Sequence, residues 1–216
     1  MAPRVYRLSA GDISFTVIKK AVRNCTLRIK GGELVVTAPS SMSDSQVILA
    51  VQRHTRWAEK HLARAEQAKG KVFLLGQAYD LKEEYAARGG VVFADGICVL
   101  KGKDDKHREK ALLDNYKKTM KETLPALFDK WQKETGLRAS EIVVTSAKSY
   151  LGRCEIADRR IKISCRLARK SPDVIEYVVL HELCHLKISG HQKNFYALVS
   201  KYMPDYKVRI KKMKAE

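Results

Sequence analysis

The chain has 216 residues, 45% hydrophobic and 31% charged, a balance that is ordinary for a folded globular protein and excludes a disordered one. Its 42 Lys and Arg against 24 Asp and Glu give a formal net charge of +18, which excludes an acidic protein and favours anionic partners, including nucleic acid. No apolar stretch approaches the roughly 20 residues that cross a bilayer, and the first residues lack a secretory apolar segment, so we expect a cytoplasmic protein without a membrane partner.

The first third of the chain predicts a small sheet followed by a helix. Pro39 should end the sheet, because proline cannot donate a ladder hydrogen bond. Ser43 and Gln46 form a capping box, which predicts one helix over about residues 44–68. The strands are predicted as an antiparallel sheet over 5–8, 13–18, 25–29 and 33–37, the last two joined in a hairpin by Lys30-Gly31-Gly32.

The middle of the chain predicts a second group of strands and then a long helix. Apolar residues at helical spacing follow Asp104 and continue to Gly136, with Pro125 expected to kink the helix. The composition changes near residues 101–106, which predicts a β-rich region with one helix over 1–103 and a catalytic region over 104–216, or one continuous domain. The strands are expected at 72–75, 78–84, 91–93 and 97–100.

The last third predicts a strand pair that leads into a buried helix. Residues 142–144 and 161–163 are expected to pair antiparallel. Ser171 suits an N-cap and Pro172 suits the first helical position, so a helix should run from about 172 to 188. This helix is apolar nearly all round, as a buried helix should be. A further helix is expected from near His191 to a residue before Pro204.

The segment His181-Glu182-Leu183-Cys184-His185 lies on that buried helix and indicates a metal site. Residues four apart project from one helix face on consecutive turns, so His181 and His185 can reach one ion. Glu182 lies about 100° further round and is placed to act as the catalytic general base. A polar cluster without metal is the alternative interpretation of these residues.

A catalytic zinc ion needs a third protein ligand and one open position, and His191 is the natural third ligand. We expect Gly190 to adopt the left-handed conformation that ends a helix, so that His191 returns toward the ion. The predicted cofactor is one Zn²⁺ ion, with another divalent metal as the alternative. Zinc would lower the pKa of its water toward 7, and Glu182 would take the proton.

The stretch from His181 to His191, with Phe195 and Pro204-Asp205-Tyr206 beyond it, resembles the YgjP-like metal-dependent hydrolases. This family of zincin-type metallopeptidase-like proteins is related to the SprT and WLM groups. The resemblance is strongest over residues 140–210. Upstream of the helix, this chain lacks the arginine and tryptophan that the family usually has. It keeps four other residues of the family pattern: Gly152, Cys154, Arg166 and Leu167. It implies a peptide or protein substrate that pairs with an edge strand beside the metal.

Together these observations predict an α+β fold: an antiparallel amino-terminal sheet with helices, and a zincin-like carboxyl-terminal region of helices and a small sheet. The predicted function is a zinc-dependent metallopeptidase. A nucleoside triphosphate pyrophosphohydrolase is one alternative, because basic residues over 153–170 could bind phosphates, and a nucleic-acid-binding module with a vestigial metal site is another. The candidates for substrate binding and for the oxyanion donor are Tyr150, Arg153, Arg166 and Tyr202.

Overall fold

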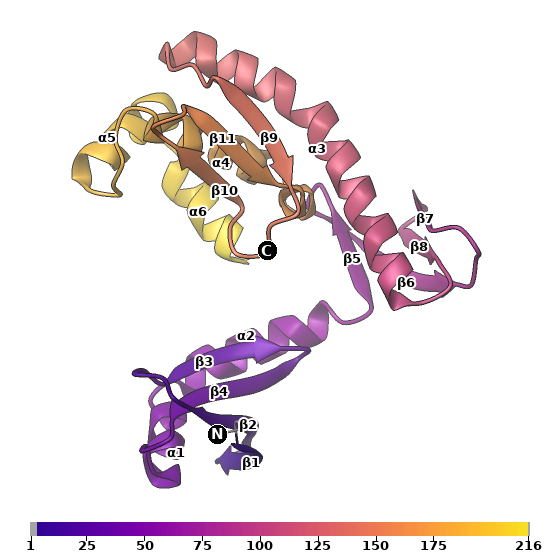
Figure 1. The fold of residues 1–216 in the computed structure, drawn as a ribbon, viewed down its shortest axis with the longest axis vertical. Coiled ribbons are helices and arrows are strands. Elements are labelled where there is room, and N and C mark those ends of the chain that lie inside the picture. The colour runs from indigo at the N-terminus through magenta and orange to yellow at the C-terminus, as the bar shows by residue number, and fades with distance from the viewer. Residues whose placement is uncertain (1–3, 216) are drawn as a thin grey trace. The chain divides into compact units, whose positions relative to one another are not determined.

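A computed structural model describes residues 4–215 and divides the chain into two compact units, Met1–Gly70 and Lys71–Glu216 (Figure 1). Residues 1–3 and 216, the ends of the two regions predicted from the sequence, lie outside the described residues. The boundary expected at 103–104 falls inside the second unit. The fold is α+β, with several small mixed sheets, as the sequence predicts in outline.

The amino-terminal unit contains a four-stranded sheet in the order β1-β2-β4-β3, with β2 parallel to β4. The prediction of an antiparallel sheet is therefore wrong. β2 and β4 carry the most buried side chains and occupy the centre, so the chain crosses to the edge strand β3 before its Gly31-Gly32 hairpin returns it as β4. The strands are β1 (Arg4–Ala10), β2 (Ile13–Lys20), β3 (Thr26–Lys30) and β4 (Glu33–Pro39).

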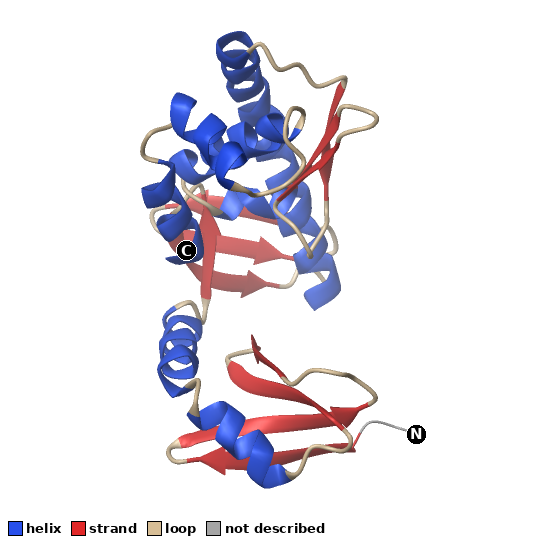
Figure 2. Cartoon of the chain, turned by 90° about the vertical axis from the view of Figure 1, so that its left-hand side faces the viewer, coloured by secondary structure: helices blue, strands red, loops and turns tan. Residues whose placement is uncertain are grey.

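Two helices, α1 (Asp44–Gln52) and α2 (Thr55–Gln67), pack on this sheet (Figure 2). The capping box of Ser43 and Gln46 forms as predicted. The prediction of one helix is wrong, because His54 leaves the helical conformation at φ −117° and ψ 17°. The Thr55 hydroxyl donates to the carbonyl of Gln52 at this break, a local bond that competes with helix continuation.

The second unit begins with a sheet in the order β5-β6-β8-β7, and the strands occur close to their predicted positions. β6 and β8 are parallel neighbours, and each forms an antiparallel pair on its other side. The sheet contributes Val72, Cys98 and Leu100 to the core of the unit. Its strands are β5 (Lys71–Leu74), β6 (Gln77–Glu84), β7 (Gly90–Ala94) and β8 (Ile97–Lys101).

The long helix α3 (Asp105–Thr135) connects the two sheets of this unit, since it packs against β7, β8 and β9 (Figure 1). Asp104 caps its first turn by accepting a hydrogen bond from the amide of His107, and Gly136 ends it at φ 73°. Pro125 lies inside the continuous helix. One stripe of the helix is buried in the core: Tyr116, Met120, Leu124, Phe128 and Trp131.

A three-stranded sheet in the order β10-β11-β9 lies on the other side of α3. β9 (Glu141–Thr145) and β11 (Arg160–Ser164) are parallel, so the prediction of an antiparallel pair is wrong. The reason is β10 (Gly152–Glu155), which forms the hairpin with β11 and takes the antiparallel position on its other side. β10 is thereby an edge strand, and it packs against α4.

Helix α4 (Pro172–His185) follows the 3₁₀ helix η1 (Cys165–Arg169) and is the most buried helix of the unit. Ser171 and Pro172 occupy the predicted N-cap and first helical positions. The helix ends at His185 rather than near residue 188. The prediction that Gly190 is left-handed is wrong. Leu186 caps the helix in a right-handed conformation, and a loop follows it.

Two further helices complete the unit, α5 (Lys193–Tyr202) and α6 (Tyr206–Ala215), and both pack on α4. α5 begins two residues after His191 and ends before Pro204, close to the prediction. Within residues 4–215, no helix combines the length and the apolar character needed to cross a membrane.

Candidate metal centre

Three histidines meet at the carboxyl end of α4. His181 and His185 lie one turn apart on the helix, and the loop after it brings His191 against them. The Nε2 atoms are 3.2 Å apart between His181 and His185, 3.1 Å between His185 and His191, and 3.0 Å between His181 and His191. The predicted ligand residues therefore lie together, and their three ring nitrogens form a nearly equilateral triangle.

This triangle has the size that one small cation requires. Zn–N bonds of about 2.0–2.1 Å in a tetrahedral site place neighbouring ligand nitrogens about 3.3–3.4 Å apart. The observed separations of 3.0–3.2 Å are slightly smaller than that. The three nitrogens therefore suit one divalent ion, which His181, His185 and His191 would hold.

The outer nitrogens of two rings indicate which tautomer is present. The Nδ1 of His185 lies 2.9 Å from the carbonyl oxygen of Ile188, which can only accept, so Nδ1 carries the proton and Nε2 is a bare lone pair. The Nδ1 of His181 lies 3.2 Å from the hydroxyl of Tyr177. Such outer partners fix the ring orientation of metal-binding histidines. Lone pairs that face one another repel unless a cation lies between them.

The surroundings also favour the neutral, metal-binding form of His181 and His185. Burial, and then the neighbouring His185 and His191, lower the pKa of His181 to about 3. Burial also lowers the pKa of His185, against the opposing effect of its bond to Ile188. The fully buried Phe195 contacts all three rings, with its centroid 4.4 Å from that of His185. The cluster thus has an apolar wall on one side.

Glu182, the predicted general base, is buried with only 6% of its surface exposed. The backbone N–H of Cys154 on β10 lies close enough to its carboxylate to lower the pKa of that group, and Gly152 of the same strand lies directly against it. Burial raises the pKa of Glu182 to about 7, and the N–H of Cys154 opposes that shift. Burial, and then the charge of Glu182, raise the pKa of the Cys154 thiol to about 11, so this thiol stays protonated at neutral pH.

The four candidate substrate residues occupy different surroundings. Arg153 is exposed on the edge strand β10. The Tyr150 hydroxyl lies 3.4 Å from Oγ1 of Thr145, and the Lys201 ammonium lies over the Tyr202 ring at 5.1 Å. Arg166 donates to Glu109 of α3 at 3.3 Å and lines a groove along that helix.

Sequence reasoning misses two contacts of the centre, the hydroxyl of Tyr177 with His181 and the close approach of Gly152 to Glu182. Tyr177 stands four residues before His181, so its place on the same helix face was a usable signal. From the sequence, Gly152 stands out only as a position that the family shares. Its approach to Glu182 depends on the pairing of β10 with β11, which the sequence did not predict.

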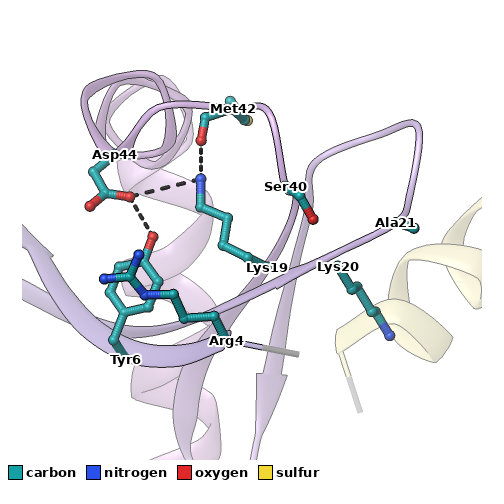
Figure 3. Close-up of a pocket in the computed structure, with 8 residues that line it drawn as sticks. All are labelled: Arg4, Tyr6, Lys19, Lys20, Ala21, Ser40, Met42 and Asp44. Carbon is teal, nitrogen blue, oxygen red and sulfur yellow. Dashed lines mark hydrogen bonds and ion pairs between the residues drawn. The ribbon is translucent and has the colours of Figure 1, made fainter. Parts of the chain in front are cut away.

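A separate cavity of about 710 Å³ lies in the amino-terminal unit (Figure 3). Lys19 crosses it to donate to the carbonyl of Met42, and its Nζ lies 3.8 Å from Asp44, which also accepts from the Tyr6 hydroxyl. These bonds fix the segment that leads into α1. The residues that line the cavity include no histidine.

Comparisons with known proteins agree with the metal centre. A family model described as YgjP-like, metallopeptidase domain matches residues 23–216. No curated protein matches the chain. The crystal structure of the metallopeptidase zymogen of Pyrococcus abyssi abylysin is 22% identical over 37% of this chain and 78% of its own, with a TM-score of 0.34. This structural likeness is too slight to carry an argument.

Proposed function

The chain belongs to the YgjP-like family of metallopeptidase domains, and we propose that it is a zinc-dependent peptidase whose ion is held by His181, His185 and His191. The observation that carries this proposal is the triangle of three Nε2 atoms 3.0–3.2 Å apart. Three imidazoles with one open position are the donor set of a catalytic rather than a structural zinc site. When bound, the ion supplies a Lewis acid and lowers the pKa of a water molecule toward 7.

In this proposal Glu182 acts as the general base. It follows His181 directly on α4, so its carboxylate lies beside the ligands but on a different helix face. The carboxylate lies against Gly152 of β10, near the N–H of Cys154. The Glu182 carboxylate takes the proton of the attacking water and then passes it to the amine that leaves.

The edge strand β10 is the proposed platform for the substrate. Its far side has no partner strand among residues 4–215, while β11 covers its other side. An extended peptide that adds to this edge would run past Glu182, because β10 packs on α4 at that residue. Arg153, Tyr150 and Tyr202 remain the candidates for contacts with the substrate or its oxyanion. Arg166 is a weaker candidate, since its guanidinium binds Glu109.

Neither alternative function gains support from the basic residues of 153–170. A phosphate-binding site needs cations that are free to meet the ligand. Arg160 instead contacts Glu141 and Glu155, Lys162 contacts Glu155, and Arg166 contacts Glu109. Three of the seven cations in this stretch thus bind carboxylates of the protein itself.

The test is casein cleavage by the zinc-loaded protein, with a chelator control and a panel of nucleoside triphosphates in parallel. Glu182→Gln should keep one zinc per chain and lose turnover by at least about 100-fold, because the amide cannot accept the proton. Turnover that survives in Glu182→Gln would remove this residue from its role. Phosphate release without peptide cleavage would overturn the proposed peptidase.

The ligand set is tested separately by metal content. His191→Ala should bind less than one zinc per chain by mass spectrometry, since only two ligands remain. The matched control is His61→Ala in α2, which removes a histidine of the amino-terminal unit and should leave the stoichiometry unchanged. Unchanged zinc content in both variants would require another third ligand.

A further inference from the structure

Gly152, the first residue of β10, lies so close to Glu182 that no side chain fits between them. A Cβ atom on Gly152 would lie 2.5 Å from Oε1, 2.6 Å from Cγ and 2.8 Å from Cδ of Glu182. These are the three nearest atoms to that position, and all belong to one side chain. The missing Cβ therefore leaves space for the Glu182 carboxylate rather than for the core in general.

The backbone conformation gives no other reason for glycine here. Gly152 does not adopt the left-handed backbone conformation. Its strand pairs regularly with β11, and Gly152 lies opposite Ile163. Alanine could adopt this extended conformation without strain. The requirement for glycine is thus one of space alone, in contrast to Gly76, which has φ 82° as well as a close neighbour in Ser171.

The same strand also brings a backbone donor toward the carboxylate. The N–H of Cys154, two residues along β10, lies close enough to Glu182 to lower the pKa of its carboxyl group. Glu182 is only 6% exposed, and burying a carboxylate without a nearby donor costs free energy. Space at residue 152 and a donor at residue 154 together form a cradle for Glu182, which we define as the Gly152–Cys154 cradle.

We propose that Gly152 is a positioning residue for the Glu182 carboxylate, which its lack of a side chain allows to lie against β10 beside the Cys154 N–H. The role of that carboxylate in peptide cleavage rests on the proposed function, whereas the steric relation does not. Ordinary contacts to a Cβ begin near 3.4 Å, so alanine at residue 152 would displace Oε1 by about 1 Å. A displacement of that size can cost a reaction about 100-fold in rate.

The first test is a stability cycle on the metal-free protein, which needs no activity. Gly152→Ala should lower Tm by roughly 5 °C, because overpacking a buried site strains its neighbours. In the Glu182→Ala background the same change should shift Tm by less than about 1 °C, because the three clashing atoms are gone. An equal loss of Tm in both backgrounds would overturn the proposal. Should Gly152→Ala not fold alone, the double variant should still fold with the Tm of Glu182→Ala, and its failure to do so would also refute the proposal.

The second test measures zinc content and casein kinetics. Gly152→Ala should keep one zinc per chain and an unchanged KM while kcat falls by about 10- to 100-fold. The control is Gly190→Ala, beside His191, where a Cβ would have no neighbour closer than 3.9 Å and the backbone is not left-handed. Wild-type kcat in Gly152→Ala would overturn the positioning role. If the wild-type protein cleaves no peptide, the proposed function fails while the stability cycle still decides the relation of Gly152 to Glu182.

Discussion

Tyr177→Phe removes one hydroxyl from the second layer around the metal centre, and we expect it to weaken zinc binding without abolishing it. The hydroxyl lies 3.2 Å from Nδ1 of His181, and Tyr177 is only 3% exposed. When Nδ1 donates to this oxygen, Nε2 of His181 is left as a bare lone pair that faces the other two rings. Phenylalanine keeps the ring and its packing. It has no hydroxyl to bond with Nδ1, so the tautomer of His181 is no longer fixed.

The size of the effect follows from the geometry of that bond. A neutral hydrogen bond contributes about 0.5–1.5 kcal/mol, and 1.4 kcal/mol corresponds to a tenfold change in an equilibrium constant. The distance of 3.2 Å is at the long end of the usual range, which favours the lower half of that interval. We therefore expect the Kd for zinc to rise by about 2- to 5-fold.

Competition with a chromophoric chelator at pH 7 measures this change directly. Tyr196→Phe is the matched control. The Tyr196 ring is 6.3 Å from that of His191, but within residues 4–215 its hydroxyl forms no hydrogen bond to the three histidines, so the Kd of this variant should match that of the wild type. Equal zinc affinity in Tyr177→Phe and wild type would show that the hydroxyl does not orient His181.

Two further predictions concern the helix interface and substrate choice. Glu176 accepts hydrogen bonds from Lys130 at 2.7 Å and from Arg209 at 2.6 Å. Burial alone would raise the pKa of Glu176, but the two bonds outweigh burial, so its pKa is lowered. Its stabilising effect is therefore present above the unfolded pKa of about 4.3 and is lost as the pH falls through the lower folded pKa. Glu176→Gln should cost about 1–2 kcal/mol at pH 7 in chemical denaturation, and a difference that persists undiminished at pH 2 would contradict this account. Arg153→Glu should shift cleavage in a peptide library from acidic toward basic side chains near the scissile bond, since Arg153 is exposed on β10, and an unchanged profile would exclude contact with the substrate.

Some helix ends were predictable because their signals are local, whereas the end of α4 was not. Ser43 with Gln46, Asp104 and Gly136 each act within four residues of the chain, and each caps a helix in the structure as its sequence indicates. The break at His54 escaped prediction because a hydroxyl-to-carbonyl bond from Thr55 competes with an otherwise helical pattern.

Strand partners could not be predicted, since pairing is set by contacts between distant segments. The alternation in β2 and β4 marks both as half-buried, but it does not state that they run parallel with β3 at the edge. The same limit applies to β9 and β11, which pair in parallel because β10 occupies the other side of β11. The approach of Gly152 to Glu182 follows from this arrangement, so it could not be predicted from the sequence either.

The metal centre itself depends on the rotation of α4 about its axis. Tyr177, His181 and His185 are spaced by four residues, so one face of the helix carries two histidines and the outer partner of the first. Ten of the fourteen residues of α4 are buried, and core packing of this extent resists rotation of the helix. The core therefore holds the histidine face toward His191 and Glu182 toward β10 before any ion binds, which is the preorganisation that a catalytic site requires.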